Sequence, residues 1–163
     1  MDQAIGVPVI KRILSYIDTG TTAMADRPWE NDVAAYCCDE HLAAETQGLF
    51  RNHPLLMGLS CDWPKPGDWR TDDLAGVPIL IARGGDGVLR AFLNVCRHRG
   101  AKVADGCGHS SVFSCPYHAW RYDRAGRLVA IPDQRSFPGV DCADHGLVPL
   151  PLLERNGLLW VLP

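Results

Sequence analysis

NVCRHRGAKVADGCGHSSVFSCPYHAW, residues 94–120, is the stretch that decides the fold of this 163-residue chain. It holds two mixed pairs of potential metal ligands. Cys96 and His98 are separated by one residue, and Cys115 and His118 are separated by two. We therefore expect two short loops, each of which presents one sulfur and one imidazole to a shared site.

These four side chains suit a [2Fe–2S] cluster in which one iron takes two thiolates and the other takes two imidazoles. Such a cluster is neutral when oxidised, whereas four thiolates would leave it negative. It therefore accepts an electron more readily, at roughly −150 to +300 mV against about −400 mV for plant-type ferredoxins. The main alternative is a zinc-stabilised binding module. Zinc modules usually keep like ligands together, so the mixed pairs favour the iron–sulfur cluster.

The sequence around the two pairs resembles the N-terminal Rieske [2Fe–2S] domain of a ring-hydroxylating (Rieske non-haem iron) oxygenase α subunit. The resemblance covers roughly residues 50–163, and more loosely the residues before them. It implies that the two cysteines bind the inner iron, that the two histidines bind the outer iron, and that His118 faces the electron acceptor. The segments that carry it are Gly76–Arg83, Asp86–Ala101, Cys115–Asp123 and Gly126–Leu128.

The loops also contain a predicted supporting shell. Glycine and proline in the loops would shape the backbone so that N–H groups reach the cluster sulfurs, and the tryptophan would shield the cluster. For the two arginines three interpretations stay open: they neutralise the reduced cluster, dock an acidic partner, or are simply solvated. The predicted shell comprises Arg97, Arg99, Gly100, Pro116, Tyr117 and Trp120.

Departures from related proteins refine the resemblance. Rieske proteins of respiratory complexes carry an additional disulfide between the loops, and here Ala101 and Tyr117 occupy the corresponding places. Trp120 stands where those proteins have a potential-raising serine, although Tyr122 keeps the accompanying tyrosine. These differences imply the lower-potential, cytoplasmic branch. Ala119 replaces a usual glycine and is strained if that position needs a positive φ.

Composition excludes several classes of function. The chain has 16 basic and 19 acidic residues and a net charge of −3, so it has no electrostatic footprint for nucleic acid. The five cysteines outside the two pairs are irregularly spaced, which favours a reducing compartment over a disulfide framework. We see no signal peptide and no long apolar run, so we expect a cytoplasmic protein without a membrane segment.

The first 50 residues are predicted to form a helical extension. Apolar residues recur at helical spacing over 9–17, and Asp39 is placed to cap a second helix over 40–51. We expect these helices to lie outside the strand-rich part, with the apolar stripe of the first one either packed in the core or bound to a neighbouring subunit.

Residues 51–163 are predicted to form the Rieske domain, a mainly β, antiparallel sandwich or small barrel with two cluster-binding hairpin loops. Residues 61–73 are predicted to be a loop, and 132–145 a polar surface excursion. Gly84–Gly87 is a strong hairpin signal. The expected strands cover 55–59, 77–83, 88–95, 112–114, 120–122, 127–131, 147–153 and 157–162.

The resemblance also implies a reaction that this sequence does not complete. Oxygenase α subunits carry a C-terminal catalytic domain whose mononuclear iron is held by two histidines and a carboxylate. After His118 only His145 remains, so that catalytic domain is absent from these residues. We expect one-electron transfer, with a ferredoxin or flavin reductase as donor, a non-haem iron catalytic domain as acceptor, and a homo-oligomeric assembly. A free-standing carrier of the Rieske ferredoxin type is the alternative.

Overall fold

The computed structural model describes residues 3–163 and divides the chain into two compact units, Met1–Cys38 and Asp39–Pro163. The boundary between the two units lies after Cys38, inside the predicted extension 1–50. The second predicted helix therefore belongs to the unit that holds the strands. No helix of the described residues is long and apolar enough to cross a membrane.

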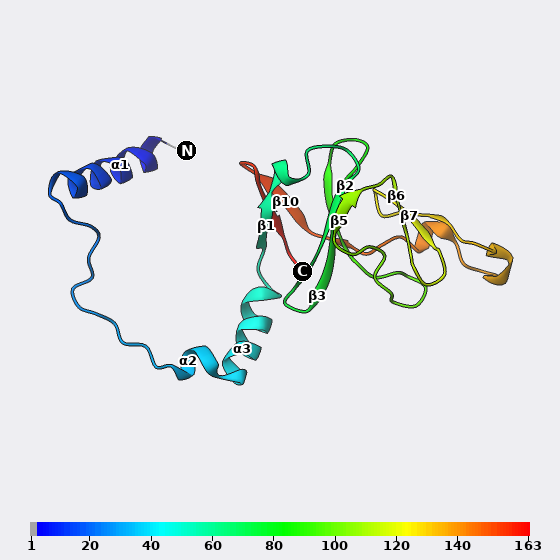
Figure 1. The fold of residues 1–163 in the computed structure, drawn as a ribbon, viewed down its shortest axis with the longest axis horizontal. Coiled ribbons are helices and arrows are strands. Elements are labelled where there is room, and N and C mark those ends of the chain that lie inside the picture. Colours follow the sequence, from blue (N-terminus) through cyan, green and yellow to red (C-terminus); the bar gives the residue numbers. More distant parts are fainter. Residues whose placement is uncertain (1–2) are drawn as a thin grey trace. The chain divides into compact units, whose positions relative to one another are not determined.

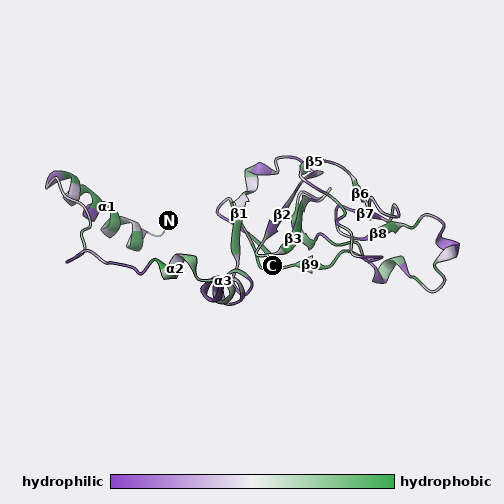
Figure 2. Ribbon diagram, turned by 60° about the horizontal axis from the view of Figure 1, so that its bottom comes forward, coloured by the Kyte–Doolittle hydropathy of each residue, from purple (hydrophilic) through white to green (hydrophobic). Residues whose placement is uncertain are grey.

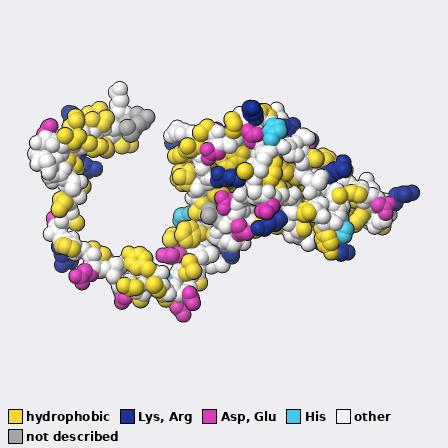
Figure 3. All heavy atoms as spheres, viewed as in Figure 1, with side chains coloured by type: hydrophobic (Ala, Val, Ile, Leu, Met, Phe, Trp, Pro, Cys, Tyr) yellow, Lys and Arg dark blue, Asp and Glu magenta, His cyan; other side chains and the backbone are white. Residues whose placement is uncertain are grey.

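The first unit contains helices α1 (Gln3–Asp18) and α2 (Ala34–Cys37). The predicted helix 9–17 is confirmed. It is longer than expected, since α1 begins before Pro8 and contains this residue. Figure 3 shows hydrophobic side chains at the surface of this helix, and Ile13 and Ile17 are 51% and 69% exposed. The stripe is not covered within the first unit, and both expected outcomes stay predictions.

The second unit begins with a helix that changes its pitch. Helix α3 covers Asp39–Glu45 and continues as a π-helical turn over Thr46–Phe50. Asp39, the predicted cap, is already the first helical residue. The helix ends before Pro54, since proline lacks the backbone N–H that a continued helix needs.

Eleven strands follow in three antiparallel sheets, which confirms the mainly β prediction (Figure 1). The first sheet has the order β1-β11-β10, the second β5-β2-β3-β4-β9 and the third β6-β7-β8. The strands are β1 (Leu55–Leu59), β2 (Asp68–Leu74), β3 (Val77–Arg83), β4 (Leu89–Leu93), β5 (Cys107–His109), β6 (Val112–Ser114), β7 (Arg121–Asp123), β8 (Leu128–Ala130), β9 (Pro149–Leu150), β10 (Leu152–Arg155) and β11 (Leu158–Val161).

Strand β2 corrects the prediction of a loop over 61–73. Its sequence, DWRTDDL, is polar and follows two prolines, so strand propensity gave no signal. The strand forms because it pairs with β3 from Trp69 opposite Ala82 to Leu74 opposite Val77. Ala75 and Gly76 close this hairpin with positive φ angles of 55° and 72°, which match the turn type that twisted hairpins prefer.

The predicted strand 147–153 is two strands in different sheets. β9 pairs with β4 at Phe92 opposite Pro149, whereas β10 pairs with β11 at Leu152 opposite Val161. Pro151 lies between them and lacks a ladder donor. The chain therefore changes sheets at this residue.

Two apolar cores hold the second unit together, and β1 and β3 are hydrophobic along their lengths in Figure 2. One core joins the first sheet to β3 and β4. It consists of Met57, Trp63, Ile79, Ile81, Leu89, Ala91, Leu159 and Val161. The other lies around the two cysteine–histidine loops and consists of Leu80, Ala82, Phe92, Cys96, Val103, Phe113, Cys115, Trp120, Tyr122, Leu128, Ile131 and Leu147. The ligand loops are thus part of a core.

The prediction of two hairpin loops holds for one loop only. Residues 115–120 connect the paired strands β6 and β7, whereas the first loop runs from β4 to β5, which lie on opposite sides of β2 and β3. The strands at the two ends of the first loop do not pair with each other. The loop is held instead by Asn94, which is 1% exposed. Its side-chain oxygen accepts the N–H groups of Val103 and Ala104 at 3.0 and 3.3 Å, and its Nδ2 donates to Ala104 O at 2.9 Å.

Substitution Asn94→Ala should therefore destabilise the fold by about 2–4 kcal/mol, because it leaves buried backbone groups without partners. The control Asn52→Ala removes an exposed side chain with one hydrogen bond, to Gln47 O, and should stay within about 1 kcal/mol. The midpoint of urea unfolding, followed by circular dichroism, measures both. Equal midpoints for the two variants would contradict this role of Asn94.

Candidate metal centre

The first ligand loop is a tight turn that closes on Cys96. Its N–H donates to Ala101 O at 2.8 Å, and its carbonyl accepts the N–H of Gly100 at 3.0 Å. Gly100 has a φ of 76°, in the left-handed region that glycine adopts without strain. This turn presents Cys96 on its inner side and His98 at its tip.

The second ligand loop repeats these hydrogen bonds. The N–H of Cys115 donates to Trp120 O at 2.9 Å, and its carbonyl accepts the N–H of Ala119 at 3.0 Å. Ala119 occupies the position equivalent to Gly100 and has a φ of 56°. The position therefore needs a positive φ, and alanine is strained there by about 1–2 kcal/mol. The two loops are copies of one backbone turn despite their different spacings.

The two thiols lie inside the core. Cys96 and Cys115 are 3% and 4% exposed, and both are free. Burial raises the pKa of Cys96, and the neighbouring Cys115 acts in the same direction. Tyr122 opposes this: its hydroxyl lies 3.2 Å from the Cys96 sulfur and also accepts the N–H of Arg97 at 3.0 Å. A bound metal cation stabilises the thiolate form that such a site otherwise disfavours.

The two imidazoles lie side by side. The ring centroids of His98 and His118 are 4.6 Å apart, with the planes at 67°. The Nδ1 atom of His118 is buried and has no hydrogen-bond partner among the described residues. Burial lowers the pKa of His98, and the adjacent His118 lowers it further, so the neutral, metal-binding form is favoured. A buried ring nitrogen without a hydrogen-bond partner, next to a second imidazole, is what we expect of a metal ligand.

Aromatic rings surround the imidazoles. Trp120 stacks on His98 with centroids 5.0 Å apart and planes at 8°, and Tyr117 lies 4.0 Å from His118. Phe137 meets His98 edge-on at 5.2 Å. The structure thus places Tyr117 and Trp120 at the site as predicted. It adds Phe137, which lies in the segment predicted as a surface excursion and which no ligand spacing indicates.

The remaining members of the predicted shell lie at the surface. Arg97 and Arg99 are exposed, and neither forms an ion pair among the described residues. The Arg99 guanidinium lies 6.0 Å from the centre of the Tyr117 ring. Gly100 and Pro116 are exposed turn residues. The arginines therefore leave positive charge near the imidazoles that nothing in the described chain neutralises.

The donor set fits two metal ions better than one. A structural zinc site needs four ligands around one ion. Two buried thiols and two adjacent imidazoles, contributed in pairs by two equivalent turns, instead fit a [2Fe–2S] cluster with two protein ligands on each iron.

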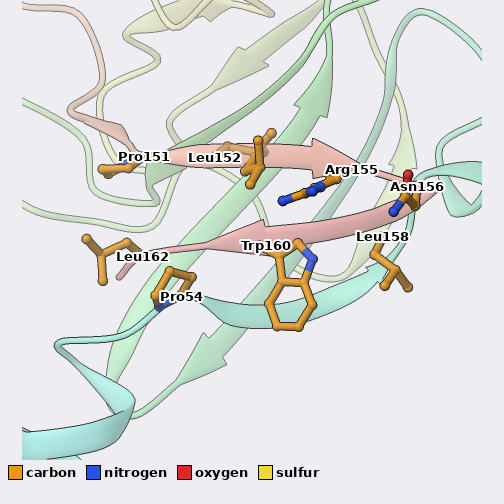
Figure 4. A pocket seen from close by; sticks show the side chains of 9 residues that line it. Pro54, Pro151, Leu152, Arg155, Asn156, Leu158, Trp160 and Leu162 are labelled. Atoms are coloured by element: carbon orange, nitrogen blue, oxygen red, sulfur yellow. The ribbon is translucent and has the colours of Figure 1, made fainter. Parts of the chain in front are cut away.

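A separate apolar groove of about 640 Å³ lies on β10 and β11. Figure 4 shows Trp160 and Leu162 from β11 and its end beside Pro54, with Leu152 and Arg155 of β10 opposite. No cysteine, histidine or carboxylate lines it. The groove therefore offers no ligands for a metal, and the chemistry belongs to the two loops.

Comparison with curated proteins shows what this arrangement is similar to. The chain is 35% identical over 138 residues to the α subunit of biphenyl 2,3-dioxygenase from Rhodococcus jostii (strain RHA1), which covers 83% of the chain and 30% of that subunit. It is 32% identical to the oxygenase subunit of carnitine monooxygenase from Acinetobacter baumannii, which covers 85% of the chain and 38% of that subunit. The chain thus spans about a third of the length of these relatives.

Solved structures show a similarity to the same class of oxygenases. The quaternary ammonium Rieske monooxygenase CntA in complex with L-carnitine superimposes with a TM-score of 0.75 at 31% identity, over 83% of this chain and 39% of that one. Another structure, of a quaternary ammonium Rieske monooxygenase, gave insights into carnitine oxidation by gut microbiota and inter-subunit electron transfer. Naphthalene 1,2-dioxygenase from Rhodococcus sp. gives a TM-score of 0.72 at 29% identity, over 76% of this chain and 29% of that one.

The family model for the Rieske [2Fe–2S] domain matches residues 53–148, which contain both ligand loops and most of the strands. The match covers more than half of the chain and confirms the predicted family and its cofactor type. The chain belongs to the Rieske [2Fe–2S] domain family, and its relatives are oxygenase α subunits.

Proposed function

We propose that this chain relays single electrons to a non-haem iron oxygenase centre, with Cys96, His98, Cys115 and His118 as the cluster ligands. The observation that carries the proposal is the buried His118 Nδ1, which lacks a hydrogen-bond partner and lies in a ring that faces His98. A buried polar atom without a partner costs free energy unless a ligand satisfies it. The two buried thiols supply the other half of the donor set.

When bound, the [2Fe–2S] cluster supplies reversible one-electron chemistry. The protein supplies the surroundings: Cys96 and Cys115 lie in an apolar core that excludes water, and Tyr122 provides an O–H beside the Cys96 sulfur. The tip of the second loop is open to a partner, since Tyr117 is 59% exposed and His118 is partly exposed. Electrons therefore enter and leave at the histidine side.

The proposed partners are inferred from the relatives. Because the oxygenase subunits are about three times longer than the matched segment, we propose a non-haem iron catalytic domain as the acceptor and a ferredoxin or flavin reductase as the donor. We also propose a homo-oligomeric assembly, and the inter-subunit electron transfer described for a quaternary ammonium Rieske monooxygenase supports an assembly of several subunits. We also propose the division into an extension 1–50 and a domain 51–163. The family match, which begins at residue 53, supports this boundary.

A cyclic voltammogram of the iron-loaded protein tests the relay directly. We expect a reversible one-electron couple within roughly −150 to +300 mV, the range of histidine-ligated clusters. A folded, iron-containing preparation without a reversible couple would rule out electron relay. A couple near −400 mV would indicate four thiolate ligands instead.

Substitution His118→Cys should lower the midpoint potential of any cluster that still assembles, because a thiolate adds a negative charge to the cluster. Potentiometry followed at the visible absorbance measures the shift. His109→Cys is the control, since His109 is exposed and bonded to Asp68 at 2.9 Å, and it should leave the potential unchanged. An unchanged potential for His118→Cys would remove His118 from the ligand set.

Substitution Tyr122→Phe should also lower the potential. Burial raises the pKa of Tyr122, so the hydroxyl keeps its proton and can donate to the Cys96 sulfur. A donor to a cluster sulfur stabilises the more negative, reduced form. Tyr36→Phe, which removes an exposed hydroxyl bonded to Asn31, is the control. The same potential for both variants would show that this hydrogen bond does not tune the cluster.

A further inference from the structure

The excursion between β8 and β9 contributes to the site although the sequence suggests a polar surface segment. Residues 132–136 are exposed, but Phe137, Val140 and Cys142 are partly buried against the core that contains the ligand loops. Farther along, the ring of His145 lies 6.2 Å from Trp120. One side of the excursion therefore covers the site while the other faces solvent.

The backbone turn by itself does not fix the ring plane of His98. The χ2 torsion of histidine is broad, so a tight turn places the Cβ atom but leaves the imidazole free to rotate. Metal-binding histidines are usually oriented by a hydrogen bond from the second ring nitrogen to a carboxylate or carbonyl. Neither ring nitrogen of His98 has such a partner among residues 3–163. Packing against neighbouring rings is therefore the restraint that the protein supplies.

Two aromatic rings provide that restraint. Trp120 lies parallel to the His98 ring at 5.0 Å, and Phe137 meets the same ring at 5.2 Å and 89°. Phe137 also meets Trp120 at 5.5 Å and 80°. Each of the three rings therefore contacts the other two at distances and angles typical of favourable aromatic pairs. Rotation of the imidazole would break its contacts with both of these rings.

The position of Phe137 is itself defined by the backbone. Its N–H donates to Gln134 O at 3.0 Å, and its carbonyl accepts the N–H of Val140 at 3.2 Å. The preceding short 3-10 helix, Gln134–Ser136, starts after Asp133, whose φ is 49°. These local turns direct Phe137 inward while Arg135, two residues earlier, is almost fully exposed.

We infer that Phe137 is a positioning residue that fixes the imidazole plane of His98 through direct contact and through Trp120. The inference rests on the proposed function, because it treats His98 as a cluster ligand. Phe137 also limits the access of water to that side of the ring. Since water stabilises the more highly charged reduced form, loss of Phe137 should raise the midpoint potential as well as loosen the ring.

The test compares Phe137→Ala, Phe137→Leu and Arg135→Ala in the cluster-loaded chain. The midpoint potential and the electron paramagnetic resonance spectrum of the dithionite-reduced protein are measured for each. We expect Phe137→Ala to raise the potential and to broaden or shift the g-values, because the imidazole plane is no longer unique. Phe137→Leu, which keeps apolar bulk but no ring, should shift both in the same direction by less. Arg135→Ala should match the wild type.

If Phe137→Ala does not assemble a cluster, Phe137→Leu decides the question. A leucine variant identical to the wild type in potential and spectrum would overturn the inference, since Phe137 would then only fill space. A shift in both quantities would support it. A wild-type protein that shows no signal on reduction would instead refute the proposed function.

Discussion

Two equivalent backbone turns carry the site, and each depends on one residue in the left-handed region. Gly100 and Ala119 take this conformation so that the turn can close on Cys96 and Cys115. Closure places each thiol inside the core and leaves each histidine near the tip. The separation of the two thiols from the two imidazoles therefore follows from the geometry of a single turn used twice.

The turns hold their positions through buried polar groups as well as apolar packing. Asn94 ties the end of β4 to the first loop, and Tyr122 on β7 reaches across to Cys96 and to the N–H of Arg97. Each of these side chains is almost fully buried. Since buried polar groups are stable only with all their partners in place, the loops have little freedom to rearrange.

Much of the fold and site could be predicted from sequence because the signals were local. The two ligand pairs, the hairpin at Gly84–Gly87 and the short alternating strands are all encoded within a few residues. Strand β2 was missed because its DWRTDDL sequence forms a strand only through pairing with β3. The change of sheet at Pro151 was missed because it is set by strand pairing, of β9 with β4 and of β10 with β11. Phe137 reaches His98 across 39 positions of sequence, and no spacing rule connects them.

The most direct test of the account is the electron paramagnetic resonance spectrum of the purified chain before and after anaerobic dithionite reduction, with iron and acid-labile sulfide counted on the same sample. The account predicts a rhombic signal that appears only on reduction, with iron and sulfide in equal amounts. A silent spectrum from a folded protein with bound zinc would contradict it, since the two cysteine–histidine pairs would then form a structural site without redox chemistry.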